Sequence, residues 1–156
     1  MAILALLRHG PTDWNAERRL QGRSDIPLSA AGRQAVRQWR LPPWAASCKW
    51  QSSPLSRAVE TAEILHQEMK AQEALSIEPA LIEMSYGQWE GRGLAELRRE
   101  FGAGMAELEA RGLDFRPPGG ESPRDVQDRL RPWLDELGRS DVTTLAIAHK
   151  GVMRAI

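Results

Sequence analysis

The sequence lacks two features that would point to particular classes of protein. It has one cysteine, Cys48, so no disulfide can form within the chain and no CxxC metal-binding pair is present. Neither sign of charge is in excess, because 21 lysines and arginines balance 21 aspartates and glutamates. A chain without net charge has no general attraction for nucleic acid or anionic membranes, and we predict neither as a partner.

Lysine is also scarce, with Lys49, Lys70 and Lys150 the only three. The remaining basic residues are arginines scattered along the chain, so an anionic ligand has to be bound by a few local guanidinium groups.

Long hydrophobic runs are absent as well, and no segment approaches the length that spans a bilayer. The opening "MAILALL" is too short for a signal peptide, lacks a basic leader and is followed by no small-residue cleavage site. We therefore predict a cytoplasmic protein. With 156 residues, 42% apolar and 27% charged, and no internal repeat, we expect residues 1–156 to form a single domain.

Hydrophobic patterning predicts strands and helices in alternation. The runs "ILALL" (3–7), "CKWQSSP" (48–54) and "VTTLAIAH" (142–149) are typical of strands. Helices are expected in 28–40, 56–71, 94–112 and 121–138, the third interrupted by Gly102 and Gly104. Ser29 and Ser122 are expected N-caps, with Pro123 and Asp125 completing a capping box and Gly138 a C-cap.

This alternation predicts an α/β fold with a mostly parallel sheet, in which ligands bind beyond the carboxyl ends of the strands. Two of the predicted strands, from opposite ends of the chain, run directly into a histidine, His9 and His149. The third ends shortly before Arg57. If the strands are neighbours, these three side chains meet at one edge of the sheet.

Six ordered segments carry a family resemblance: "LLRHGPTDWN", "QGRSDIPLSAAGRQA", "SSPLSRAVETAEIL", "YGQWEG", "PPGGES" and "AHKGVMRA". Together they resemble the histidine phosphatase superfamily, also called the phosphoglycerate mutase-like family. The resemblance implies a three-layer α/β/α sandwich and metal-independent phosphoryl chemistry without a cofactor, on a small phosphorylated substrate. It implies the phosphatase branch, because the segment 91–122 is short for a mutase.

The resemblance also implies the catalytic roles. His9 would attack phosphorus as a neutral imidazole and form a phosphohistidine. Arg8 and Arg57 would bind the phosphoryl oxygens with their planar guanidinium groups. His149 would act as an imidazolium that stabilises the transition state. Glu83 would serve as general acid and then as general base, with a pKa that apolar neighbours could raise.

Further positions match the family's phosphate and substrate contacts. Glu90 is the local competitor of Glu83, and Thr12 and Trp14 fill the pattern around the phosphate loop. The implied binding residues, besides the two arginines and His149, are Gly10, where a missing Cβ lets backbone approach the phosphate, Asn15, Gln21, Gly22 and Tyr86.

The sequence departs from the family pattern at two places. Pro11 stands where many relatives have glutamate. The sequence also stops at Ile156, seven residues after His149, so the domain is expected to lack the family's usual C-terminal helix and edge elements. The apolar surface they normally cover is then expected to be exposed or covered by another copy, as in a homodimer.

Two alternatives to a phosphatase stay open at this point. A phosphoglycerate mutase would share every step up to the phosphohistidine and then return the phosphoryl group to the substrate. A phosphate-binding module without activity would keep the fold alone. A metal hydrolase is disfavoured, because two histidines without an aspartate or cysteine cluster provide too few ligands, and no metal site is predicted.

Overall fold

The computed structural model describes residues 2–156. The strands are β1 (Ile3–Arg8), β2 (Lys49–Ser52), β3 (Leu75–Ile77) and β4 (Thr143–Ala148). The helices are α1 (Asp13–Ala16), α2 (Ala30–Gln38), α3 (Ser56–Met69), α4 (Leu94–Phe101), α5 (Ala103–Glu109), α6 (Pro123–Gly138) and α7 (Lys150–Ala155). Short 3₁₀ turns cover Pro43–Ser47, Pro79–Leu81, Gly87–Trp89 and Gly112–Asp114.

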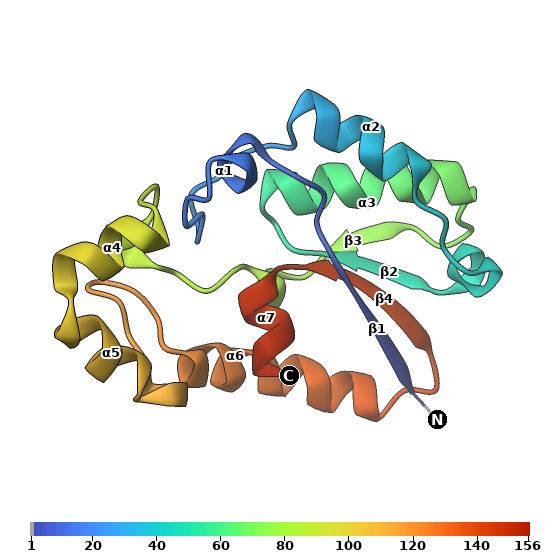
Figure 1. The fold of residues 1–156 in the computed structure, drawn as a ribbon. Helices are drawn as coiled ribbons and strands as arrows, with labels where there is room; N and C mark the ends of the chain where they lie inside the picture. The colour runs from blue at the N-terminus through green and yellow to red at the C-terminus, as the bar shows by residue number, and fades with distance from the viewer. Residues whose placement is uncertain (1) are drawn as a thin grey trace.

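The strands of the described chain form one parallel sheet in the order β1-β4-β2-β3 (Figure 1). β1 pairs with β4 from Ile3 opposite Thr143 to Arg8 opposite Ala148. β2 lies on the other side of β4. The predicted parallel sheet is confirmed, and the first and last strands of the chain are neighbours. Their carboxyl ends therefore meet at one edge.

Helices cover both faces of this sheet, with α2 and α3 on one side and α6 and α7 on the other (Figure 1). The side chains of β4 show this division, because successive residues of a strand point to opposite faces. Leu145 and Ile147 belong to the core under α2 and α3, whereas Ala146 and Ala148 belong to the core under α6 and α7. The predicted three-layer sandwich is confirmed.

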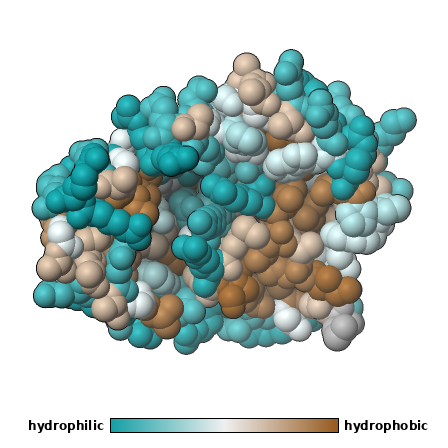
Figure 2. All heavy atoms as spheres, viewed as in Figure 1, coloured by the Kyte–Doolittle hydropathy of each residue, from teal (hydrophilic) through white to brown (hydrophobic). Residues whose placement is uncertain are grey.

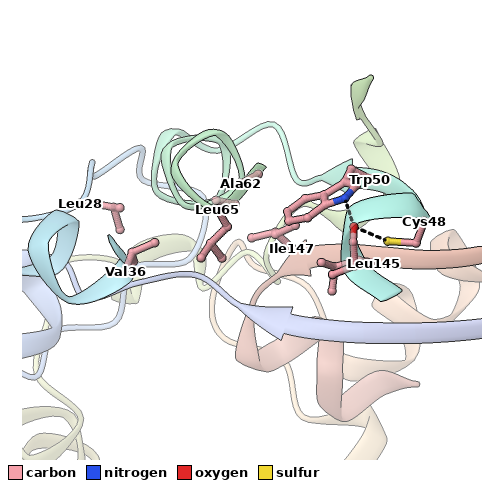
Figure 3. Close-up of a cluster of buried hydrophobic side chains, with 10 residues drawn as sticks. Leu28, Val36, Cys48, Trp50, Ala62, Leu65, Leu145 and Ile147 are labelled. Atoms are coloured by element: carbon pink, nitrogen blue, oxygen red, sulfur yellow. Dashed lines mark hydrogen bonds between the residues drawn. The ribbon is translucent and has the colours of Figure 1, made fainter. Parts of the chain in front are cut away.

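Figure 3 shows the core under α2 and α3, where Trp50 is fully buried. Its indole N–H donates to the carbonyl oxygen of Ala45 at 2.8 Å, and the Cys48 thiol donates to the same oxygen at 3.4 Å. Burial raises the pKa of the Cys48 thiol. The single cysteine is therefore a packing residue and not a reactive one.

Local capping signals determine where the helices begin. Ser29 caps α2 by accepting a hydrogen bond from Gly32, and Ser122 and Asp125 form the expected capping box at the start of α6. The C-terminal prediction for α6 is wrong. Gly138 is still helical, and the cap is Arg139 in a right-handed conformation. A glycine is favoured at a C-cap only where the backbone turns left-handed, and it does not do so here.

The expected helix over 94–112 is divided into α4 and α5 at Gly102, whose positive φ of 49° no longer continues a helix. Gly104, also expected to interrupt it, lies inside α5. These two helices lie beside the sandwich (Figure 1) and enclose a small core that contains Trp89, Leu97 and Met105. The short edge strand β3 was missed, because its three residues show no extended apolar pattern.

The outer edge of β1 pairs with no other strand among residues 2–156. Ile3 is 52% exposed there, and Figure 2 shows hydrophobic surface over this part of the molecule. Whether a further segment or a second copy covers this surface stays a prediction.

Within the described residues, no helix is long and apolar enough to cross a membrane. The cytoplasmic location, the absence of nucleic-acid and membrane partners, and the single-domain boundaries stay predictions.

Candidate active site

Three parallel strands end together and deliver polar side chains to one place. The backbone N–H of His9, just after β1, donates to the carbonyl oxygen of Ala148 at 3.1 Å. On the other side of β4, the N–H of Ser53 donates to Ile147 at 2.9 Å. The rings of His9 and His149 consequently lie with their centroids 5.1 Å apart. The predicted meeting of the two histidines is confirmed.

The bonding of the His9 ring fixes its tautomer. Nδ1 lies 2.7 Å from the carbonyl oxygen of Gly10. A carbonyl oxygen only accepts, so Nδ1 carries the proton and Nε2 keeps its lone pair in the neutral ring. Burial, with smaller effects from Arg57 and Arg8, lowers the pKa of His9 to about 4. At neutral pH this histidine is an uncharged base with Nε2 unprotonated.

His149 is fully buried, and its Nε2 lies 2.7 Å from the hydroxyl of Ser53. Burial and the charge of Arg57 lower the pKa of His149 well below its usual value. The direction is opposite to the one that the expected imidazolium requires. The cause is that His149 lies behind His9 and Arg57, away from solvent and among positive groups.

Arg57 is also fully buried, at the first turn of α3. Its two terminal nitrogens donate to the carbonyl oxygens of Gly22 at 2.6 Å and Ser24 at 2.8 Å. Its Nε has no hydrogen-bond partner among the described residues. Arg57 therefore fixes the loop over residues 22–24 and brings a desolvated positive charge to the site. The sequence predicted the charge but not the bonds to the loop.

Glu90 fixes the same loop from the opposite side. Its carboxylate accepts hydrogen bonds from the backbone of Arg23 and Ser24, from the Ser24 hydroxyl, and from the backbone of Tyr86, at 2.7–3.1 Å. Gly22 has a φ of +53°, and a Cβ at this position would collide with that carboxylate. A carboxylate that joins two loops by four hydrogen bonds is occupied structurally. This geometry favours Glu83 over Glu90 as the acid.

Glu83 is 7% exposed and lies against the start of α7. One carboxyl oxygen accepts from the backbone of Met84 at 2.8 Å, and the other accepts from Gly151 at 3.3 Å. Burial raises the pKa of Glu83, although the two backbone donors and Arg57 oppose the effect. A side chain at residue 151 would collide with this carboxyl group. This direction agrees with the raised pKa of Glu83 that its apolar sequence neighbours suggested.

A small hydrogen-bonded cluster lies next to α1 and is formed by Thr12, Asn15 and Gln21. Thr12 and Asn15 form a capping box at α1, and the hydroxyl of Thr12 lies 2.9 Å from the side-chain oxygen of Gln21. Gly10 also has a packing role, while its expected approach to phosphate stays a prediction. A Cβ there would collide with Val36 of α2, so the absent side chain serves helix packing.

A cavity of about 120 Å³ joins these residues. Its walls are Arg8, His9, Asn15, Arg19, Leu20, Gln21, Gly22, Arg57, Glu83, Tyr86 and Lys150. Every site residue expected from the sequence lines it except Gly10 and His149, which lie next to or behind His9. A wider hollow borders Arg8 and His9 on the other side, but it lacks Arg57 and Glu83, so we place the site in the smaller cavity.

The structure adds residues that the sequence analysis missed. Ser53 bonds His149, and its signal was the "SSP" that ends the predicted second strand. Arg19 and Lys150 line the cavity, and Lys150 directly follows His149. Arg129 of α6 gave no signal, because its role depends on contacts with a distant segment.

Arg129 holds the segment that leads to Glu83. Its guanidinium donates to the carbonyl oxygens of Ala80 and Ile82, the latter at 2.6 Å, and pairs with Glu121 at 3.4 Å. Arg23 adds a hydrogen bond to the carbonyl oxygen of Glu83 at 3.3 Å. The backbone before Glu83 is thus attached to α6.

Among residues 2–156, no group of three or more histidine, cysteine or carboxylate side chains could hold a metal ion. The positive charge of the site comes from the arginines and Lys150.

Comparison with protein families shows the family of this chain. The family model for the histidine phosphatase superfamily (branch 1) matches residues 4–156. The chain belongs to the histidine phosphatase superfamily. The resemblance inferred from the six sequence segments is therefore confirmed.

Curated relatives in this superfamily carry mutase names. The chain is 33% identical to 2,3-bisphosphoglycerate-dependent phosphoglycerate mutase 2 of Gloeobacter violaceus, over all of this chain and 74% of the relative. It is 38% identical to the probable phosphoglycerate mutase GpmB of Salmonella paratyphi C, over 86% of this chain and 62% of the relative. The chain thus spans less than two thirds of the length of the second relative.

Solved structures of this superfamily include a phosphatase. The mycobacterial glucosyl-3-phosphoglycerate phosphatase in complex with VO3 matches with a TM-score of 0.82 and 29% identity, over 99% of this chain and 79% of that one. A protein of Thermus thermophilus, TTHB049, matches with a TM-score of 0.76 and 35% identity, over 98% of this chain and 81% of that one.

The lowered pKa of His9 makes stability depend on pH. Because the folded-state pKa is about 4 and the usual value is 6.5, the unfolded chain binds more protons between these values. The contribution is complete above pH 6.5 and is lost as pH falls towards 4, by roughly 3 kcal/mol in the free energy of unfolding. In urea unfolding, the free energy of unfolding of the wild type should fall between pH 6.5 and pH 4 by roughly 3 kcal/mol more than that of His9→Ala. Asn15→Ala, which removes a cavity side chain without a titrating group, should keep the slope. An unchanged slope in His9→Ala contradicts the burial argument.

Removing the attachment of the Glu83 segment should destabilise the fold. In Arg129→Met two carbonyl oxygens lose their charged donor, which should cost about 2–4 kcal/mol in urea unfolding. Arg131→Met, on the same helix, breaks only the exposed ion pair with Asp128 and should change stability by less than about 0.5 kcal/mol. Equal losses in the two variants would show that Arg129 acts through charge alone.

Proposed function

We propose that this protein hydrolyses phosphomonoesters through a phosphohistidine at Nε2 of His9, without a metal ion. The observation that carries the proposal is the fixed state of His9, a neutral ring with its proton on Nδ1, in a cavity that also contains Arg8, Arg57 and Glu83. Family membership supports this chemistry. The names of relatives include both a phosphatase and mutases.

In the first step, Nε2 of His9 attacks phosphorus while the bond from phosphorus to the ester oxygen breaks. Arg8 binds the phosphoryl oxygens, and Arg57, whose two terminal nitrogens hold the loop over 22–24, contributes its positive charge and its unpartnered Nε. Glu83, whose pKa burial raises, acts as the general acid and donates a proton to the departing oxygen. The products of this step are the free alcohol, phosphohistidine and the Glu83 carboxylate.

In the second step, the Glu83 carboxylate takes a proton from water, and the oxygen of that water attacks phosphorus. The nitrogen–phosphorus bond breaks, orthophosphate leaves, and both His9 and Glu83 return to their starting states. One buried carboxyl group thus supplies the acid and the base in turn.

His149 enters this scheme through its protonation state. In the structure, burial and Arg57 keep the pKa of His149 low. A phosphoryl dianion beside the ring would oppose both effects and raise that pKa. We propose that His149 becomes protonated together with substrate binding, while Ser53 holds the ring in place.

A mutase is the second candidate, favoured by the names of the curated relatives. It would share the first step and then pass the phosphoryl group to a second hydroxyl of the substrate. The inactive phosphate-binding module remains the third alternative. The three candidates differ in their products. A phosphatase releases orthophosphate, a mutase isomerises phosphoglycerate, and the inactive module binds phosphate without turnover.

The phosphoenzyme gives the direct test of the nucleophile. With excess EDTA present, rapid acid-free quenching of a reaction with ³²P-labelled phosphomonoester should trap label on the protein that is lost in acid, as phosphohistidine is. His9→Ala should trap none, whereas His66→Ala, a histidine of α3 outside the cavity, should trap as much as the wild type. An acid-stable label on serine, or labelling that EDTA abolishes and one metal restores, would sink the proposal.

The role of Glu83 can be tested through the leaving group. An alkyl phosphate departs as a strongly basic alkoxide and needs a proton, whereas p-nitrophenolate leaves without one. Glu83→Gln should therefore slow phosphorylation of His9 by about 10²–10⁴-fold for the alkyl ester and much less for the aryl ester. Single-turnover kinetics isolates this first step from the second.

Glu90→Gln is the matched control. It removes a nearby carboxylate that holds the loop and to which we assign no proton transfer. It should slow both esters by the same factor. If the dependence on the leaving group appears in Glu90→Gln and not in Glu83→Gln, the assignment is wrong.

A further inference from the structure

Ser53 lies where three elements of the site meet. It follows β2 directly, and its backbone N–H donates to the carbonyl oxygen of Ile147 in β4 at 2.9 Å. Its hydroxyl oxygen accepts a hydrogen bond from the backbone N–H of Leu55, the residue before α3, at 3.3 Å. The same oxygen lies 2.7 Å from Nε2 of His149. The side chains of Ser53 and His149 are fully buried, so the bonding of each has to be satisfied inside the protein.

These contacts decide the direction of the bond between Ser53 and His149. A hydroxyl group has one hydrogen to donate, and among residues 2–156 the ring of His149 is the only acceptor with which the Ser53 hydroxyl forms a hydrogen bond. If Nε2 carried the hydrogen instead, the hydroxyl hydrogen of Ser53 would be buried without a partner, which is unfavourable. The Ser53 hydroxyl therefore donates to Nε2 of His149.

The direction of this bond fixes the tautomer of His149. Burial and the charge of Arg57 lower the pKa of His149 well below its usual value, so the ring is neutral at neutral pH. A neutral imidazole carries one hydrogen, and because Nε2 accepts, that hydrogen is on Nδ1. Nδ1 is buried and has no hydrogen-bond partner within the described part of the chain. It is therefore an unused donor.

Arg57 carries a second unused donor. Its Nε has no partner in the described residues, whereas its terminal nitrogens bond the loop over 22–24. Arg57 lines the catalytic cavity together with His9, and the ring of His149 lies 5.1 Å from that of His9. Two unpartnered donors beside the nucleophile suit a group that only accepts hydrogen bonds, and a phosphoryl group is such a group.

We propose that Ser53 is a positioning residue that holds neutral His149 in the Nδ1–H tautomer, so that Nδ1 donates a hydrogen bond to the phosphoryl group transferred to His9. The inference rests on the proposed function, because the acceptor is the phosphoryl group of that reaction. With the opposite tautomer, Nδ1 would direct a lone pair at the phosphoryl oxygens and repel them. Ser53 thus decides whether His149 attracts or repels the phosphoryl group before the ring gains a proton.

This bond also bears on the protonation of His149 during substrate binding. The added proton would go to Nε2, and the Ser53 hydroxyl would turn and accept a hydrogen bond from it. The hydroxyl hydrogen would then lose its acceptor. Ser53 therefore favours the neutral ring until the charge of the bound phosphoryl group outweighs that loss.

Nuclear magnetic resonance tests the tautomer without any turnover. In ligand-free protein with ¹⁵N-labelled histidine, rings in the Nδ1–H and Nε2–H forms give different nitrogen–proton correlations. We expect the Nδ1–H form for His149. His66 is the reference for the opposite form, because its Nε2 lies 2.7 Å from the carbonyl oxygen of Glu73, which can only accept. Spectra of His149→Ala and His66→Ala identify the two sets of signals.

Ser53→Ala and Ser52→Ala form a matched pair. Each removes the hydroxyl of a fully buried serine, but the Ser52 hydroxyl donates to the carbonyl oxygen of Ser53 at 2.9 Å and not to a histidine. Ser53→Ala should lose the fixed Nδ1–H form of His149. It should also slow phosphorylation of His9 about 10–100-fold, as loss of a hydrogen bond to a charged group implies. Ser52→Ala should keep both the tautomer and the wild-type rate.

A double-mutant cycle separates positioning from a general structural effect. If Ser53 acts through His149, Ser53→Ala should slow phosphorylation less than about 2-fold further in a His149→Ala background. A general structural effect would cost the same factor in both backgrounds. Far-ultraviolet circular dichroism checks that each variant is folded.

The outcomes separate this inference from the proposed function. The Nε2–H form of His149 in the wild type overturns the inference, and so does a Ser53→Ala protein that keeps the Nδ1–H form and the wild-type rate. An equal loss in both backgrounds of the cycle overturns it as well. Absence of a phosphoenzyme in the wild type refutes the proposed function, and the role of Ser53 in catalysis fails with it. Failure of the inference alone shows as an active wild type with contrary spectra or a contrary cycle.

Discussion

The parallel pairing of β1 with β4 is the constraint on which the site depends. Residues that are 140 positions apart in the chain become neighbours because the register places Arg8 opposite Ala148, which puts His9 and His149 just beyond the same end of the two strands. The rings then lie 5.1 Å apart without any direct bond between them. A shift of register by one residue would turn every side chain of the strand to the other face of the sheet and would separate the two histidines.

Charge in this site is arranged by burial. The guanidinium group of Arg57 keeps its charge out of contact with solvent, and both histidines are held uncharged because burial and the nearby arginines lower their pKa values. Burial acts in the opposite direction on a carboxyl group and raises the pKa of Glu83. The result is a cavity with positive charge from arginines, a neutral histidine base and a carboxyl group whose pKa burial has raised.

The loops around this site are attached to helices of the sandwich and to each other. The loop over 22–24 is fixed by Arg57 of α3 on one side and by Glu90 on the other. The segment before Glu83 is fixed by Arg129 of α6, and the carboxyl group itself contacts the backbone of α7. Each layer of the sandwich thus contributes to the position of a cavity residue. This agrees with the general observation that functional side chains are held accurately when rigid elements support them.

The sequence by itself determined the fold class, the capping of α2 and α6, and the identity of most residues in the cavity, because these features depend on local patterns and on motifs near His9, Arg57, Glu83 and His149. Only the tertiary structure decided which tautomer His9 adopts, that His149 is kept neutral, that Gly10 serves packing, and that Ser53 and Arg129 support the site. The reason is physical. Protonation states, close approaches and hydrogen bonds to carbonyl groups depend on burial and on partners from distant segments, and no local pattern records them.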